Sequence, residues 1–225
     1  MASHQEIAGV SDQDFVQRMI NSHDGRFDEV FWNHIEASVK PLLPAAPRIV
    51  DLGCGPGLLA RDFALRFPAG DIYGFDLTAA MIDHANNKIE FEGKKPSFEV
   101  LDITANPVPL EGGSVHLLTM AAVLHVLDDP LKICHEIRRL LAPGGVFLLV
   151  DWVRQPLSTY LDMMMANVPP ETAEQVEKSM LRLSVAHNKY TVDDWIWLLD
   201  KGGLKVLNHT QLRSAHFCEL VCQAK

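Results

Sequence analysis

The chain has 225 residues, of which 48% are hydrophobic, and it carries a formal net charge of −9. This length allows one sizeable buried core, so we expect a single domain over residues 1–225. The negative charge disfavours sequence-independent nucleic-acid binding, which depends on Lys and Arg neutralising phosphates. We therefore expect no nucleic-acid partner.

No signal-like segment and no apolar run long enough to span a membrane is evident in the sequence. The four cysteines, Cys54, Cys134, Cys218 and Cys222, show neither CxxC spacing nor a histidine at metal-ligand distance. Cys218 and Cys222 fall on one face of the last strand pattern, which is typical of packing. We expect a cytoplasmic, reduced protein with no metal and no membrane partner.

The N-terminal region, 1–44, predicts helices. Ser11 with Asp14 three residues later is a variant of the capping signature and predicts a short helix through Ile20. A turn is expected at 22–25. A second amphipathic helix then runs over 26–43 and ends at a group of prolines before the first strand.

Strand and helix patterns then alternate along the chain. Strands are expected at 48–52, 71–75, 98–101, 115–119 and 146–151, and helices at 58–67, 78–91 and 130–141. Asp129 caps the last of these helices, and Pro130 sits in its first turn, where a missing N–H costs nothing. Alternating βα units imply an α/β fold with a doubly wound, mostly parallel sheet and helices on both faces.

The segment 153–190 fits none of these units. Its methionines, Met163, Met164, Met165 and Met180, and the pair Pro169-Pro170 predict two short helices broken at the prolines. These methionines either fill a helix-packing surface or contact a ligand. After this segment a helix begins at Thr191 and ends at Gly202, and strand patterns at 204–209 and 216–223 follow.

A glycine turn lies between the first strand and the helix that follows it. Asp51 precedes Gly53, Gly55 and Gly57, so glycine stands at every second position. Glycine has no Cβ, which lets a ligand lie directly on the backbone, and such a turn is the nucleotide-binding corner of a doubly wound sheet. A dinucleotide fingerprint needs the spacing GxGxxG, but position 58 is Leu58 and the third glycine comes one residue early.

This turn resembles motif I of the class I S-adenosylmethionine-dependent methyltransferases. Asp76 ends the next strand pattern, where a carboxylate can accept both hydrogen bonds of a ribose diol and where that family uses an acid. The helix end and turn over 140–145, before 146–150, is also typical of the family. The resemblance covers residues 26–152 well. It implies the Rossmann-like methyltransferase fold, with seven strands, the last inserted antiparallel, and a helical cap formed by 153–190 and 1–44.

The resemblance also implies S-adenosylmethionine as cofactor and a set of residues at its site. Asp102 and Ile103 meet the adenine in this family. Arg26 either reaches the cofactor carboxylate or lies on a solvated helix face. The residues assigned to the cofactor are Arg26, Asp51, Gly53, Cys54, Gly55, Gly57, Asp76, Leu77, Met81, Asp102, Ile103, Met120 and Ala121.

Candidate catalytic groups follow the fourth and fifth strand patterns, because ligands bind at the carboxyl ends of such strands. Leu124-His125 matches the first two positions of a Leu-His-His segment found in many small-molecule methyltransferases, and Val126 replaces the second histidine. His125 is either a general base or an imidazole satisfied by packing. Asp151 is the second candidate, or it caps a loop. The candidate substrate-binding residues, each with a surface or core alternative, are His23, Trp152, His187 and Tyr190.

The sequence thus predicts methyl transfer from S-adenosylmethionine to an O, N, S or C nucleophile of a small metabolite, by a monomer or homodimer. Two alternatives stay open. One is a nicotinamide-dependent oxidoreductase, disfavoured by Leu58 and by the lack of an evident hydride-transfer Tyr/Lys pair. The other is a protein that binds S-adenosylmethionine without turnover.

Overall fold

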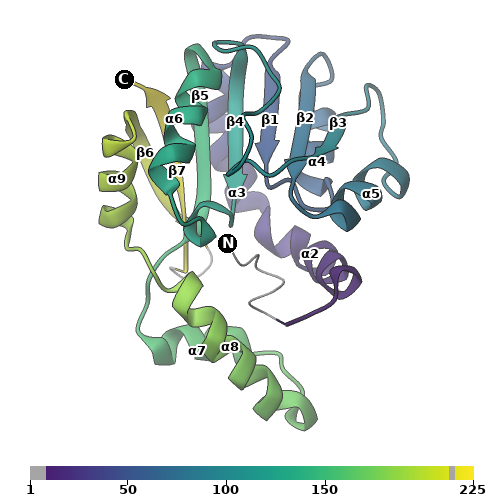
Figure 1. The fold of residues 1–225 in the computed structure, drawn as a ribbon, viewed down its shortest axis with the longest axis vertical. Coiled ribbons are helices and arrows are strands. Elements are labelled where there is room, and N and C mark those ends of the chain that lie inside the picture. The colour runs from purple at the N-terminus through teal and green to yellow at the C-terminus, as the bar shows by residue number, and fades with distance from the viewer. Residues whose placement is uncertain (1–8, 213–215) are drawn as a thin grey trace.

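The computed structural model describes residues 9–212 and 216–225. Its centre is a seven-stranded sheet with the order β3-β2-β1-β4-β5-β7-β6 (Figure 1). Strands β1, β2, β3, β4 and β5 pair with their neighbours in parallel, and β7 runs antiparallel to both β5 and β6. The expected doubly wound, mostly parallel sheet with an inserted antiparallel strand is therefore confirmed. The strands are β1 (Arg48–Leu52), β2 (Asp71–Asp76), β3 (Ser97–Val100), β4 (Val115–Ala121), β5 (Leu141–Trp152), β6 (Leu204–Leu212) and β7 (Phe217–Ala224).

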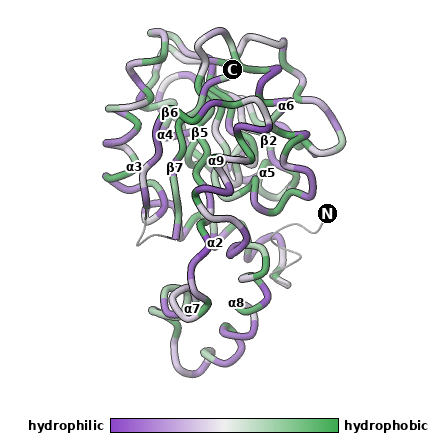
Figure 2. Tube along the Cα trace, turned by 90° about the vertical axis from the view of Figure 1, so that its left-hand side faces the viewer, coloured by the Kyte–Doolittle hydropathy of each residue, from purple (hydrophilic) through white to green (hydrophobic). Residues whose placement is uncertain are grey.

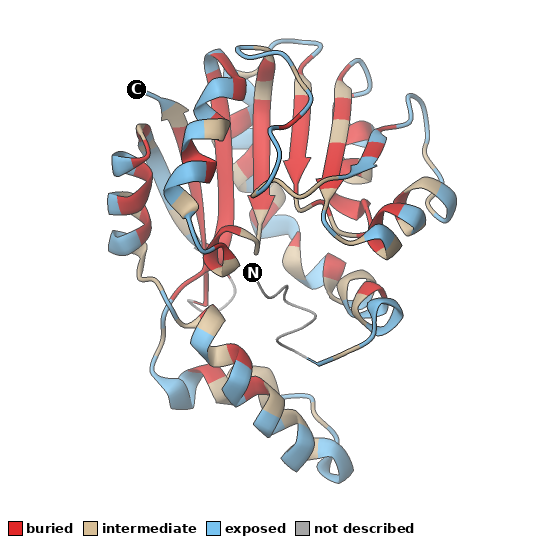
Figure 3. Ribbon diagram, viewed as in Figure 1, coloured by how far each residue is buried: buried red, intermediate tan, exposed pale blue. Residues whose placement is uncertain are grey.

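Helices cover both faces of the sheet, and each face has its own core. Neighbouring strand residues point to opposite sides, so Ile49 joins one core and Val50 the other. The first core packs against α4 (Leu58–Arg66) and the second against α6 (Pro130–Leu140) and α9 (Val192–Lys201). The central strands are buried on both sides (Figure 3), which explains their nearly continuous apolar sequences. α5 (Ala79–Asn87) adds Ile82 and Ala85 to the first core.

The N-terminal helices differ from the predicted pattern. Ser11 caps the first helix as expected, by accepting from the backbone N–H of Asp14, but α2 (Asp12–Arg26) continues through the predicted turn at 22–25. The break comes later, where Asp28 accepts from the N–H of Phe31 and caps α3 (Glu29–His34). A π turn at Ile35–Val39 and a 3₁₀ turn at Lys40–Leu42 then lead to β1.

The segment 153–190 forms α7 (Leu157–Met165), a 3₁₀ turn (Pro170–Thr172) and α8 (Ala173–His187). The two helices are separated at the prolines as predicted, although α8 is 15 residues long rather than short. They project beyond the carboxyl ends of the parallel strands (Figures 1 and 2). Asn188 joins the two ends of this segment, because its side chain accepts from the N–H of Gln155 at 2.6 Å and donates to the Gln155 carbonyl at 2.6 Å.

Candidate functional site

The glycine turn after β1 opens onto the carboxyl ends of the strands. Gly53, Gly55 and Gly57 have φ angles of +75°, +54° and +83°, a left-handed conformation that side chains rarely adopt. A Cβ on Gly53 would lie 2.3 Å from Cγ2 of Val123, whereas a Cβ on Gly55 would meet open space. The turn therefore needs glycine at Gly53 to pack, and at Gly55 it leaves the backbone open to a ligand.

Asp76 at the end of β2 is tied to this turn. One of its carboxylate oxygens accepts from the N–H of Gly55 at 2.9 Å, and the other accepts from the N–H of Thr78 at 2.8 Å. Burial raises the pKa of this carboxyl group, and the two backbone donors oppose that rise. Asp76 is thus held rigidly beside Gly55, as a residue that receives a ligand hydroxyl should be.

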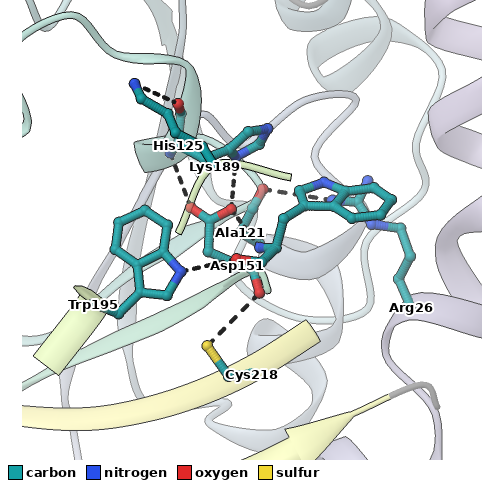
Figure 4. Close-up of polar contacts among 8 residues, drawn as sticks. Arg26, Ala121, His125, Asp151, Lys189, Trp195 and Cys218 are labelled. Atoms are coloured by element: carbon teal, nitrogen blue, oxygen red, sulfur yellow. Dashed lines mark hydrogen bonds and ion pairs between the residues drawn. The ribbon is translucent and has the colours of Figure 1, made fainter. Parts of the chain in front are cut away.

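Asp51 and Arg26 carry opposite charges and line the same cavity. Asp51 on β1 is buried and accepts from the hydroxyl of Thr119 at 2.6 Å. Burial raises the pKa of Asp51 to about 6. Arg26, the last residue of α2, donates to the carbonyl of Ala121 at 3.5 Å (Figure 4). It also lies 3.1 Å from the sulfur of Met19, and burial lowers its pKa. A carboxylate and a guanidinium in one cavity suit a ligand that carries both a cation and an anion.

These groups line a cavity of about 370 Å³. That size lies in the ordinary range of small-molecule sites, roughly 300–1,000 Å³. The predicted residues that line it are His23, Arg26, Asp51, Gly53, Cys54, Gly55, Asp76, Met81, Ala121, Trp152 and His187. The predicted residues outside its lining are Gly57, Leu77, Asp102, Ile103, Met120, His125, Asp151 and Tyr190. The structure thus brings most of the glycine turn, Asp51 and Asp76 together with residues of the N-terminal region and of the segment 153–190.

The residues outside the lining have other partners. Asp102 accepts from the N–H and the hydroxyl of Thr104 at 2.8 and 2.6 Å, and these bonds lower the pKa of its carboxyl group. Met120 is fully buried in the core beside α6 and α9. Tyr190 packs on the ring of Trp195, with centroids 4.4 Å apart. His23 does line the cavity, and its imidazole also pairs with Asp62 at 2.7 Å.

His125 and Asp151 form a fully buried pair behind the cavity. Nδ1 of His125 lies 2.6 Å from Oδ1 of Asp151, and both side chains are 0% exposed. The Asp151 carboxylate also accepts from the backbone N–H of His125 at 3.2 Å and of Trp152 at 2.7 Å. These contacts (Figure 4) join the loop after β4, which contains a 3₁₀ turn at Leu124–Val126, to the end of β5. The pair stabilises the exits of the two strands and does not touch the cavity.

Several lining residues were missed by sequence reasoning. Phe15 and Met19 line the cavity from α2, Phe27 lines it from the residue after α2, and Phe217 lines it from the start of β7. An amphipathic pattern shows that such residues are buried, but it does not show that they face a cavity rather than a helix. The methionines Met163, Met164 and Met180, singled out in the sequence, do line it together with Leu183.

Among residues 9–212 and 216–225, no group of three or more His, Cys, Asp or Glu side chains is arranged to hold a metal ion. The same described ranges contain no helix that is both long and apolar enough to cross a bilayer.

Comparison with known proteins decides the family. Residues 50–149, from β1 to β5, match the family model described as a methyltransferase domain. Residues 50–149 thus form a methyltransferase domain, which confirms the resemblance to the class I S-adenosylmethionine-dependent methyltransferases. S-adenosylmethionine is the cofactor of this family, as the glycine turn predicts, and the oxidoreductase alternative is set aside.

The relatives of this chain differ in what their names say they act on. It is 24% identical to a malonyl-[acyl-carrier protein] O-methyltransferase of Legionella pneumophila over 74% of this chain and 51% of that protein. It is 25% identical to a tRNA 5-carboxymethoxyuridine methyltransferase of Escherichia coli over 83% of this chain and 70% of that one. The chain thus spans about half the length of the Legionella protein.

The fold has close counterparts among solved structures. A SAM dependent methyltransferase from Aquifex aeolicus superposes with a TM-score of 0.64 at 19% sequence identity, covering 94% of this chain and 98% of that one.

The residues present fit S-adenosylmethionine. The backbone is open at Gly55, where a Cβ would meet nothing, and the Asp76 carboxylate is held beside it. Asp51 and Arg26 place one negative and one positive group in the same cavity. This donor set matches a ribose and a zwitterionic amino acid.

Proposed function

We propose that this methyltransferase transfers the methyl group of S-adenosylmethionine to an O, N, S or C nucleophile of a compact, largely apolar small molecule. One observation carries the proposal. A single cavity joins the glycine turn and Asp76 to apolar side chains of α2, α7 and α8.

At the cofactor end, the proposal gives each polar residue one task. Asp76, fixed by two backbone donors, uses its remaining acceptor capacity for the ribose hydroxyls. Asp51 faces the ammonium group of the cofactor and Arg26 faces its carboxylate. Gly55 lets the cofactor approach the backbone. When bound, the cofactor supplies a methyl group already activated by a sulfonium.

At the acceptor end, the chain positions the nucleophile and excludes water. A positioned acceptor and a dry cavity are the main contributions that a protein makes when the donor is already activated. The apolar side chains of α7 and α8, with those of α2, serve this purpose as a cap over the acceptor. The new bond joins the acceptor nucleophile to the methyl carbon, and a proton leaves the acceptor if it arrives protonated.

A small acceptor is supported over a nucleic acid by charge. The Escherichia coli relative acts on tRNA according to its name, but this chain has a net charge of −9 and so offers little overall attraction to phosphates. The acceptor half of the cavity is lined by aromatic residues and methionines. This lining favours an apolar metabolite.

The burial of His125 and Asp151 supports a structural role for this pair. Their side chains are fully buried and bonded to each other, which leaves neither of them at the cavity surface. We infer that they hold the exits of β4 and β5 in place. Of the two histidines that line the cavity, His23 is paired with Asp62, and His187 lies among the apolar residues of the cap.

The test has two parts. Isothermal titration with S-adenosylmethionine, S-adenosylhomocysteine and NAD should show binding of the two adenosyl ligands and much weaker binding of NAD. Saturation at ten times the dissociation constant should stabilise the fold by about 1.4 kcal/mol. Release of S-adenosylhomocysteine with a panel of apolar acceptors then separates an enzyme from a protein that only binds the cofactor. Stabilisation by NAD alone would refute the proposal.

A further inference from the structure

Three rings from distant parts of the chain meet at the acceptor end of the cavity. Trp152 ends β5, His187 ends α8 and Phe217 begins β7, and all three line the cavity. The Trp152 and His187 rings are stacked, with centroids 3.9 Å apart and planes 7° from parallel. The Phe217 ring packs against the Trp152 ring, with centroids 4.2 Å apart and planes at 43° to each other. We call these three rings the aromatic wall.

Hydrogen bonds behind the aromatic wall hold it in place. The hydroxyl of the buried Tyr160 lies 2.9 Å from Nδ1 of His187. The indole N–H of Trp195 donates to the carbonyl of Trp152 at 2.8 Å, and the N–H of Trp152 donates to Asp151 at 2.7 Å (Figure 4). Because both the rings and their backbone are held by fixed partners, the wall is rigid before any ligand arrives.

The rest of the acceptor end is adaptable. Met163 and Met164 from α7 and Met180 from α8 line the same cavity. Thioether side chains are flexible and polarisable, and they contact aromatic rings favourably. A rigid wall of aromatic rings combined with adaptable sulfur-bearing side chains suits a flat ring of variable outline better than a saturated chain.

We infer that the methyl acceptor is a planar aromatic molecule whose ring packs against the wall of Trp152, His187 and Phe217. This inference rests on the proposed methyl transfer and names its substrate class. Aromatic pairs in offset-stacked or edge-to-face geometry gain more than their buried area alone provides. A preformed wall adds affinity because no side chain has to be ordered on binding.

His187 recognises the acceptor through the packing of its flat ring and not through its basicity. Its Nδ1 is already engaged with Tyr160, and one face of the ring lies on Trp152. A phenylalanine at position 187 keeps a flat ring of similar width, whereas a leucine does not. The pair of variants His187→Phe and His187→Leu therefore separates packing from acid–base chemistry.

The experiment measures binding to the full chain saturated with S-adenosylhomocysteine, using 2-naphthol and its saturated counterpart 2-decalol as probes. The two probes share a ten-carbon skeleton and a hydroxyl, and they differ in planarity and aromaticity. We expect 2-naphthol to bind about tenfold more tightly, the size of one to two aromatic contacts. His187→Phe should keep this ratio and His187→Leu should bring it close to one.

Two further variants guard against a folding artefact. Phe217→Leu should also lower the ratio, while Trp197→Leu, an aromatic-to-leucine change at a side chain 61% exposed on α9, should leave it unchanged. Equal affinities of the two probes for the parent protein, or a ratio that survives in both His187→Leu and Phe217→Leu, would overturn the inference. A clear preference for 2-naphthol without methyl release from any aromatic acceptor would instead refute the proposed transfer and leave the aromatic site standing.

Discussion

Cofactor binding should release a proton from Asp51. Burial raises the pKa of this carboxyl group from 3.8 to about 6, so in the free protein it is about half protonated near pH 6. The cationic ammonium and sulfonium of S-adenosylmethionine favour its ionised form. Binding should therefore be accompanied by release of about half a proton at about pH 6 and of almost none at about pH 8.

The same coupling sets the pH dependence of affinity. Asp51 is about one-tenth ionised at pH 5 and about nine-tenths ionised at pH 7, so the affinity for S-adenosylmethionine should rise about tenfold across that interval. The interval stops below the pKa of an α-amino group, about 7.7–8.0, so that the cofactor's own ammonium stays charged. Isothermal titration in pairs of buffers with different ionisation enthalpies measures both the affinity and the protons released.

Asp51→Asn is the control variant, because its amide oxygen still accepts from the hydroxyl of Thr119. It should bind weakly at every pH, with neither the tenfold rise nor the proton release. A rise that persists in Asp51→Asn would assign the titration to another group, and a parent affinity that is flat from about pH 5 to 7 would refute the reasoning.

The stability of the free protein should change in the opposite direction. A carboxyl group whose folded pKa is raised contributes stability at low pH, and this contribution is lost as pH rises through the folded pKa. The ionised Asp51 costs about 3 kcal/mol above about pH 7, the equivalent of roughly two pKa units. In denaturant titrations without cofactor, Asp51→Asn should thus be more stable than the parent at about pH 8 and similar to it at about pH 4. Equal stabilities at both pH values would contradict the assignment.

Three further variants test neighbouring parts of the site. In titration calorimetry, Asp76→Ala should lower cofactor affinity at least about tenfold, since hydrogen bonds to a charged group contribute about 1.5–3 kcal/mol each. Asp76→Asn should lose less affinity, and Asp83→Ala, a change at an exposed acid, should lose none. Unchanged binding by Asp76→Ala would show that Asp76 is not part of the site. Gly53→Ala should fail to bind cofactor and should lower the melting temperature, because its Cβ would lie 2.3 Å from Val123 and its φ is +75°; normal binding would show that the turn rearranges freely. His125→Ala should destabilise the fold by about 3–5 kcal/mol, since it removes the imidazole partner of the fully buried Asp151 side chain. The variant should keep the shape of the pH–rate profile, and recovery of a lost rate at high pH would instead make His125 the general base.

Local patterns predicted the glycine turn and the acid at the end of β2 that line the cavity, but not which of the other residues assigned to the cofactor would line it. The glycines from Gly53 to Gly57 and the acid Asp76 lie within two consecutive strand–helix units. Because parallel strands have their carboxyl ends at the same edge of the sheet, these residues come close together in the fold. The alternation of strand and helix also determined the sheet, because a strand buried on both faces requires a nearly continuous apolar sequence.

Local patterns failed where a distant contact decided the structure. Ser22 to Gly25 has the composition of a turn, yet α2 continues through it. His23 within that stretch pairs with Asp62 on α4, and Phe27 packs into the core beyond it. These tertiary contacts outweigh the local preference for a turn. Because their partners lie far apart in the chain, the local sequence does not predict them.

What the sequence by itself determined is the fold, the family and the cofactor turn, all of which rest on short-range spacing and periodicity. Only the tertiary structure decided the acceptor end. His125 and Asp151 follow the expected strands, but packing turns them toward each other and away from the cavity. Trp152, His187 and Phe217 come from three separate elements, and they meet because the antiparallel β7 pairs with β5 and α8 folds back over its end. Residues that meet only through such long-range contacts follow no periodic pattern in the sequence, so the sequence alone does not predict that they form one site.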